Sequence, residues 1–118
     1  MVVVHELGLL SGVVRKIVEV RPDAKVDTVA LRVGARSGVV VESLHAAWPI
    51  ARQQAPEQCA DAELTIEFIP ATVYCPACAC EHEIDEFFAL VCPVCGAPTA
   101  DLRHGREFEI AYLDVSSN

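Results

Sequence analysis

Apolar side chains recur at intervals of three and four along residues 2–20, which predicts an amphipathic helix. The apolar stripe consists of Val3, Leu7, Leu10, Val14 and Ile17. At about 100° of rotation per residue, His5 lies almost opposite this stripe, so its side chain is expected to face solvent. Pro22 follows and stops the helix, because its ring and missing N–H do not fit a helix interior.

Three later segments alternate apolar and polar residues, as half-buried β-strands do. The predicted strands cover residues 25–33, 63–69 and 106–115. In the second strand, Leu64, Ile66 and Phe68 are expected to point inward. The apolar residues that share one side of the other two strands are Val29, Leu31 and Val33, and then Phe108, Ile110 and Tyr112.

A second helix is predicted between the first two strands. Ser37 is its expected N-cap, and its apolar face consists of Val41, Leu44, Trp48 and Ala51. Pro49 is expected to kink this helix or to end it early, because proline has no N–H to donate. The loop that follows contains an isolated cysteine, Cys59, whose expected role is that of a small buried hydrophobic residue.

These elements predict an α+β fold in which two helices cover one face of a three-stranded sheet. The chain has 118 residues, 53% of them hydrophobic, which is enough for one such core. We expect residues 1–70 and 104–118 to form this α/β domain. Residues 71–103 are then an inserted metal-binding module between the last two strands.

Four cysteines form two Cys-x-x-Cys pairs separated by thirteen residues, which is the spacing of a zinc ribbon. They are Cys75, Cys78, Cys92 and Cys95. Two such pairs bring four thiolates to one tetrahedral point, which predicts a structural Zn²⁺ site. The connection, residues 79–91, is too short and too acidic to form a core, so the ion is expected to replace one. The alternative is two separate dithiols, either redox-active or simply buried.

The net charge of −8 limits the classes of partner. Nine Lys and Arg against seventeen Asp and Glu leave little for the basic face that duplex binding needs, and anionic membranes are also disfavoured. A metal cation or a basic protein suits this charge better. The sequence shows no signal peptide and no uncharged span of roughly 18 residues. The six cysteines are therefore expected to be reduced, in the cytoplasm.

The remaining polar residues show no enzyme motif. The four histidines are scattered over different segments, and no phosphate loop or dinucleotide fingerprint is present. His5-Glu6 could offer an imidazole beside backbone nitrogens, a donor set that suits Ni²⁺ or Cu²⁺, although a solvated helix surface also explains the pair. Cys80 and His82 either assist the zinc site or lie beside it without a metal role.

The order of these features resembles the hydrogenase nickel-incorporation proteins of the HypA/HybF family. The motifs that carry the resemblance are His5-Glu-Leu, Arg32-Val-Gly34, Ser37-Gly-Val, Glu42-Ser-Leu44, the paired cysteines and Gly105-Arg-Glu-Phe-Glu-Ile. They span nearly the whole chain. The N-terminal motif together with the cysteine pattern is more specific than a zinc ribbon alone.

The resemblance implies a nickel metallochaperone and no enzymatic activity. Members of the family bind Ni²⁺ as cargo at an N-terminal Met-His-Glu, which corresponds to His5 and Glu6 here. They hold a structural Zn²⁺ through cysteines that correspond to Cys75, Cys78, Cys92 and Cys95. The partners implied are a nickel-handling GTPase, the precursor of the nickel–iron hydrogenase large subunit and, for some members, urease. A homodimer is also compatible with the resemblance.

Three positions depart from the family pattern. Three valines precede His5 where the family has a single Met, and a GUG start codon at Val4 would restore Met-His-Glu. Val40 stands where some relatives have an acidic nickel ligand, so that Glu42 is the nearest carboxylate. Cys80 stands where relatives often have a histidine.

Two other function classes fit parts of the sequence. A zinc-ribbon interaction module in a nucleic-acid-associated complex fits the cysteines, but the acidic composition disfavours it. A dithiol oxidoreductase fits one Cys-x-x-Cys pair, but a zinc ion would hold both pairs. Nickel delivery accounts for both ends of the chain and is the function that we expect.

Overall fold

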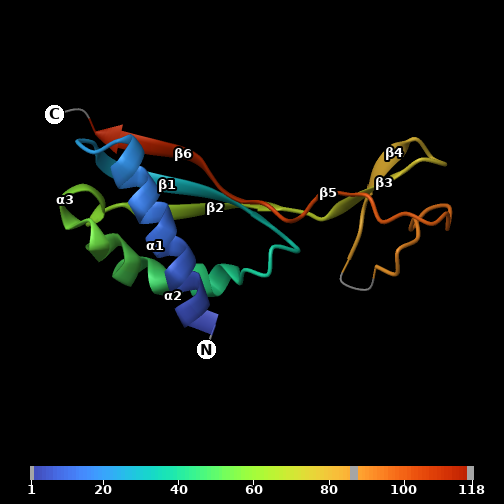
Figure 1. The fold of residues 1–118 in the computed structure, drawn as a ribbon, viewed down its shortest axis with the longest axis horizontal. Helices are drawn as coiled ribbons and strands as arrows, with labels where there is room; N and C mark the ends of the chain where they lie inside the picture. The colour runs from blue at the N-terminus through green and yellow to red at the C-terminus, as the bar shows by residue number, and fades with distance from the viewer. Residues whose placement is uncertain (1, 86–87, 117–118) are drawn as a thin grey trace.

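A mixed three-stranded sheet forms the larger of two lobes (Figure 1). The computed structural model describes residues 2–85 and 88–116, and the side chains of residues 2–4 lie outside it. The strands are β1 (Lys25–Gly34), β2 (Glu63–Ile69) and β6 (Phe108–Ser116). Strand β1 lies in the centre, parallel to β2 and antiparallel to β6.

Helices cover one face of this sheet (Figure 1). They are α1 (Val2–Val20), α2 (Val41–Ala51), the 3-10 turn η1 (Arg52–Gln54) and the short α3 (Pro56–Cys59). The last three form the crossover that a parallel β1–β2 pair requires. The predicted α+β fold, with two main helices on one face of a three-stranded sheet, is confirmed. None of the described helices is long and apolar enough to cross a membrane.

The core lies between the helices and β1. The predicted stripe of α1 is buried at Leu10, Val14 and Ile17, which pack with Val29, Leu31 and Val33 of the central strand. The side chain of Val3 lies outside the described residues. Cys59 is fully buried in this core, as predicted, and burial raises the pKa of its thiol.

Two predicted inward residues point outward. Tyr112 is 55% exposed because Ala30 pairs with Tyr112 while Leu31 pairs with Ile110, so a bulge at Ala111 reverses the alternation. Leu113 and Val115 pack on the core instead. Phe68 is 57% exposed because the end of β2 extends beyond the helices that cover the rest of the sheet (Figure 1).

The start of α2 also differs from the prediction. The N-cap is Val40, and Ser37 instead accepts a hydrogen bond from the N–H of Val39 at 3.2 Å, so Ser37 stabilises the preceding turn. Gly38 adopts a φ of +81° in this turn and separates Ser37 from the helix. The helix then passes through Pro49 and ends at Ala51, after which the chain tightens into η1.

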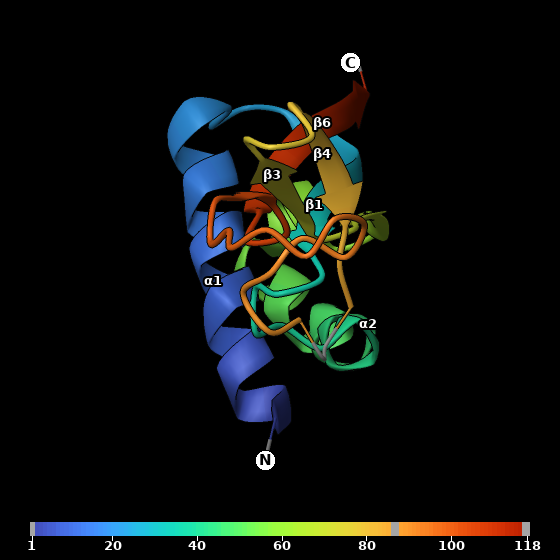
Figure 2. The ribbon, with the colours of Figure 1, turned by 90° about the vertical axis from the view of Figure 1, so that its right-hand side faces the viewer.

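The smaller lobe contains a second sheet that the sequence analysis did not predict. Its strands, in the spatial order β4-β3-β5, are β3 (Thr72–Cys75), β4 (Cys80–Glu83) and β5 (Leu102–His104). The lobe is inserted between β2 and β6, and Figure 2 shows it from its outer end. Strand β5 includes His104, which pairs with Thr72. The division of the chain into domains at residues 70/71 and 103/104 stays a prediction.

Close backbone contacts join the two lobes. The N–H of Gly34 donates to the carbonyl of Glu107 at 2.7 Å, and the N–H of Arg36 donates to the carbonyl of Gly105 at 2.6 Å. A side chain on Gly34 would overlap the carbonyl group of Gly105. Gly105 has a φ of +126° and packs on Ala71 in turn. The junction therefore depends on two glycines that allow the backbones to touch.

Candidate metal centre

The four paired cysteines converge in the smaller lobe. Their sulfur atoms all lie within 4.8 Å of one another, and they are the only such group of metal-binding side chains among the described residues. The Cys75 and Cys95 sulfurs are 3.5 Å apart, and the Cys78 and Cys92 sulfurs are 4.0 Å apart. A tetrahedral zinc ion with Zn–S bonds of about 2.3 Å needs sulfur atoms about 3.8 Å apart. The cage thus has the size that this ion requires.

Each Cys-x-x-Cys pair lies in a tight turn whose amides face the sulfur. The Cys78 N–H donates to the Cys75 sulfur at 3.4 Å, and the Cys95 N–H donates to the Cys92 sulfur at 3.5 Å. The residue after each pair has a positive φ, +56° at Ala79 and +77° at Gly96. The two halves of the cage are therefore built alike, with amides that stabilise negative charge on sulfur.

The thiols of the cage differ in pKa. The pKa of Cys92 is lowered to about 6, chiefly because the N–H of Cys95 donates to its sulfur. The pKa of Cys78 is raised, first by its hydrogen bond with the Cys95 side chain and then by burial. One thiolate is thus available at neutral pH, while Cys78 keeps a proton that a bound cation would displace.

Three polar residues lie near the cage. The Cys80 sulfur is exposed and lies 3.4 Å from Nε2 of His82, so these side chains contact each other on β4. Strand pairing sets Cys80 opposite Cys75, but Cys80 is not part of the four-sulfur group. Thr99 is buried and donates to the carbonyl of Tyr74 at 2.5 Å, which ties the second pair of cysteines to β3. The sequence contained no signal for this threonine.

The predicted nickel residues lie in the other lobe, at the start of α1. His5 is exposed, as predicted from its angle on the helix. Glu6 is fully buried, and its Oε2 accepts a hydrogen bond of 3.2 Å from the N–H of Val40. Its Oε1 is buried without a hydrogen-bond partner in the described part of the chain. Glu6 is thus held at the start of α2 with the exposed His5 next to it in the chain, and the cysteine cage lies in the other lobe (Figure 1).

The Glu6–Val40 contact was not predicted. The Glu6 carboxylate lies at the N-terminal end of α2, an 11-residue helix without a side-chain cap. A negative charge is favoured at this end of a helix. Sequence spacing alone does not reveal a contact between residues 34 positions apart. Met1, Glu86 and Phe87 lie outside the described residues.

Comparison with known proteins resolves the class of this chain. Residues 4–115 match the family described as hydrogenase/urease nickel incorporation, metallochaperone, hypA. The chain belongs to the HypA family. The hydrogenase maturation factor HypA of Chloroflexus aggregans is 36% identical over 114 residues, which cover 94% of this chain and 98% of that protein. The HypA of Roseiflexus sp. is 32% identical over 117 residues, which cover 97% of this chain and 94% of that protein.

A solved structure has the same fold. The solution structure of the Ni metallochaperone HypA from Helicobacter pylori has a TM-score of 0.67 and covers 96% of this chain and 98% of its own length. The two sequences are 21% identical, so this likeness concerns the fold. Membership of the HypA family makes the chain a nickel metallochaperone of hydrogenase maturation and not an enzyme, which excludes the dithiol oxidoreductase.

Proposed function

We propose that the chain carries Ni²⁺ on His5 and Glu6 and transfers it to the precursor of the nickel–iron hydrogenase large subunit. In this proposal the four cysteines hold a structural Zn²⁺ that is not transferred. The observation that carries it is the contrast between two donor sets in separate lobes. One is a closed group of four thiols, and the other is an exposed histidine beside a buried carboxylate.

Ligand chemistry supports a different ion at each site. Four thiolates at tetrahedral spacing favour Zn²⁺, which has no need of an open position when its role is structural. Imidazole and carboxylate or backbone donors accept Ni²⁺, and an exposed site can release it by ligand exchange. Zinc would cross-link β3 and β4 to the second Cys-x-x-Cys turn, in a lobe from which no described residue belongs to the hydrophobic core cluster.

The surroundings of Glu6 support its assignment to nickel. Oε2 is held by the Val40 N–H at 3.2 Å, which fixes the carboxylate. Oε1 has no hydrogen-bond partner among the described residues. A cation bound to this buried oxygen would offset the cost of leaving it without a partner. The valine at position 40 therefore contributes its amide to the site, although its side chain cannot ligate a metal.

The partners in this proposal follow from the family. We infer a nickel-handling GTPase that assists the transfer, the hydrogenase large-subunit precursor as acceptor, and urease as a further acceptor because the family description includes it. The homodimer and the cytoplasmic location stay predictions from the sequence.

A nickel titration of variants tests the assignment of His5. We expect His5→Ala to abolish nickel binding in isothermal titration calorimetry and to leave one zinc per chain. His104→Ala is the control, because His104 is another exposed histidine and lies on β5 in the smaller lobe, and this variant should bind nickel as the wild type does. Equal nickel affinity of His5→Ala and wild type would disprove the assignment.

A further inference from the structure

Two arginines at the junction of the lobes have no ion-pair partner among the described residues. Among the described residues, three of the nine Lys and Arg form ion pairs, namely Lys16, Arg32 and Arg103, so Arg36 and Arg106 are distinguished by their place at the junction. Arg103 at the same junction is paired, with 2.9 and 2.7 Å hydrogen bonds to Asp101, and stacks over the Tyr74 ring. Arg36 and Arg106 are exposed, and neither forms an ion pair or side-chain hydrogen bond within residues 2–85 and 88–116.

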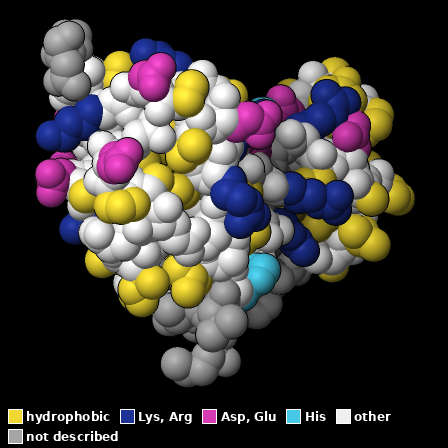
Figure 3. Space-filling model, turned by 60° about the vertical axis from the view of Figure 1, so that its left-hand side comes forward, with side chains coloured by type: hydrophobic (Ala, Val, Ile, Leu, Met, Phe, Trp, Pro, Cys, Tyr) yellow, Lys and Arg dark blue, Asp and Glu magenta, His cyan; other side chains and the backbone are white. Residues whose placement is uncertain are grey.

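The backbone holds these two arginines next to each other. The Arg36 N–H donates to the carbonyl of Gly105 at 2.6 Å, and Gly105 directly precedes Arg106. The close packing of Gly34 on Gly105 allows little change in this arrangement. Figure 3 shows Lys and Arg side chains gathered where the larger lobe meets the smaller one.

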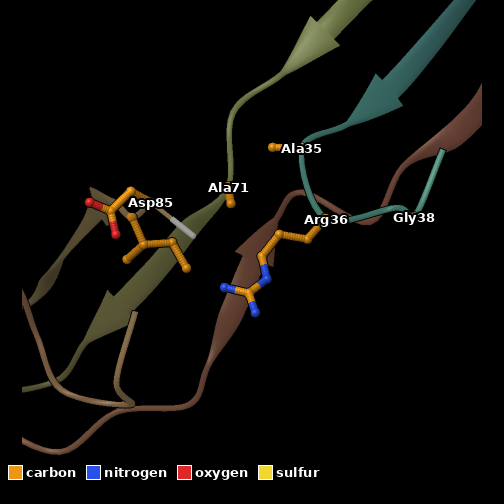
Figure 4. Close-up of a pocket in the computed structure, with 6 residues that line it drawn as sticks. Ala35, Arg36, Gly38, Ala71 and Asp85 are labelled. Atoms are coloured by element: carbon orange, nitrogen blue, oxygen red, sulfur yellow. The ribbon is translucent and has the colours of Figure 1, made fainter. Parts of the chain in front are cut away.

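Two cavities open beside the arginines. The first has a volume of about 500 Å³ and is lined by Arg36, Ala71, Ile84 and Asp85, among others. Figure 4 shows the Arg36 side chain extending along this cavity, with Asp85 on its other side. The second has a volume of about 250 Å³ and is lined by Arg103, Arg106 and Glu107, among others, with the Glu107 carboxylate already bonded to His104 and the Gly105 N–H. The junction is thus a hollowed surface with two guanidinium groups that have no ion-pair partner in the described part of the chain.

We propose that this junction, defined by Arg36 and Arg106, is a docking surface for a carboxylate-bearing segment of a partner protein. Guanidinium groups bind carboxylates through paired hydrogen bonds, which gives both affinity and orientation. The Arg36 and Arg106 guanidinium groups, positioned by one backbone contact, can each donate hydrogen bonds to one carboxylate of an extended acidic segment. The surface is separate from the cysteine cage and from His5.

The surrounding charge favours a short acidic segment over a nucleic acid. A net charge of −8 repels a long polyanion, whereas a segment with a few carboxylates is screened from distant charges beyond roughly 8 Å. Asp85 on the opposite wall of the first cavity repels any anion close to it, so a segment with widely spaced carboxylates fits there better than a dense row of phosphates. Ile84, which is partly exposed in the first cavity, provides apolar contact for the segment between its carboxylates.

Fluorescence anisotropy with a labelled peptide tests this surface. The probe is a ten-residue synthetic peptide with four glutamates, and its control has glutamine at those four positions. We expect the acidic peptide alone to bind the zinc-loaded protein, and the double variant Arg36→Glu/Arg106→Glu to weaken it at least tenfold. The charge-matched control Arg21→Glu/Lys25→Glu changes two exposed cations at the opposite end of β1 and should bind as the wild type does.

Each other result would overturn the proposal. Equal binding of the two peptides would show that carboxylates are not recognised. Equal weakening in the two double variants would show an effect of net charge alone. Displacement of the peptide by a single-stranded oligonucleotide or inorganic phosphate at lower concentration than by free acidic peptide would assign the surface to phosphate. Zinc content and thermal unfolding of each variant, compared with wild type, verify that the fold is retained, and Arg36→Gln/Arg106→Gln is the milder substitute if it is not.

Discussion

Gly34→Ala should destabilise the junction between the lobes, because the added methyl group has no space. It would overlap the backbone carbonyl of Gly105 and crowd the amide of Arg106, and backbone atoms cannot rotate away as a side chain can. Overpacking of a closed site typically costs about 1–3 kcal/mol. We expect the upper part of this range, since the same backbones also form the 2.7 Å bond between Gly34 and Glu107.

Gly8→Ala is the matched control for this prediction. Gly8 lies within α1 and is exposed, and a methyl group added there meets no atom within 4 Å. Because glycine in a helix interior costs about 0.5–1 kcal/mol relative to alanine, this variant should be more stable than wild type. The two identical chemical changes thus have opposite expected signs.

Urea unfolding followed by circular dichroism measures both effects. Both variants are compared with wild type in the zinc-loaded state, with the metal content checked after the transition. If Gly34→Ala were as stable as wild type, Gly34 and Gly105 would not be in the close contact described above. If Gly8→Ala were also destabilised, the loss would reflect a general intolerance of substitution and not the junction.

Three further predictions concern the two metal sites. Glu6→Gln should lower the free energy of unfolding by about 1 kcal/mol, because a neutral amide interacts less with the N-terminus of α2, and urea unfolding at matched zinc content measures the change. A rise in stability would contradict the role of the charge. In metal-free protein, the lowered pKa of Cys92 stabilises the fold fully above the ordinary thiol value of 9.0, and this contribution is lost as the pH falls through about 6. Ultraviolet thiolate absorbance of metal-free wild type, compared with Cys92→Ser, should show this step near pH 6, and a step near 9 in its place would refute it. Ala79→Gly should be tolerated with unchanged zinc content, because glycine adopts a φ of +56° without the cost that alanine bears, and loss of zinc would show that the turn needs the alanine.

The sequence predicted what depends on local spacing. The stripe of α1, the exposure of His5 and the grouping of the four cysteines follow from a period of 3.6 residues and from two short turns, and the structure contains all three. Tyr112 and Phe68 could not be placed in this way. A single bulge at Ala111 and the limited reach of the helices over β2 decide their exposure, and neither leaves a trace in the alternation of residues.

Contacts between distant parts of the chain could not be predicted from the sequence either. The sequence places Glu6 beside the exposed His5, but Glu6 is buried against Val40, and only the fold brings these two residues together. The second sheet was missed because β3, β4 and β5 have three or four residues each and contain cysteines and charges in place of alternating apolar residues. Strands this short form when a turn and a metal cage hold their ends, and pattern analysis does not detect them.

Metal content per chain tests the central claim that cargo and structural ions occupy separate sites. Wild-type protein and His5→Ala are exposed to nickel, desalted and analysed by plasma mass spectrometry. We predict one zinc per chain in both proteins and nickel in the wild type alone. Nickel retained by His5→Ala, or zinc replaced by nickel in either protein, would contradict the account.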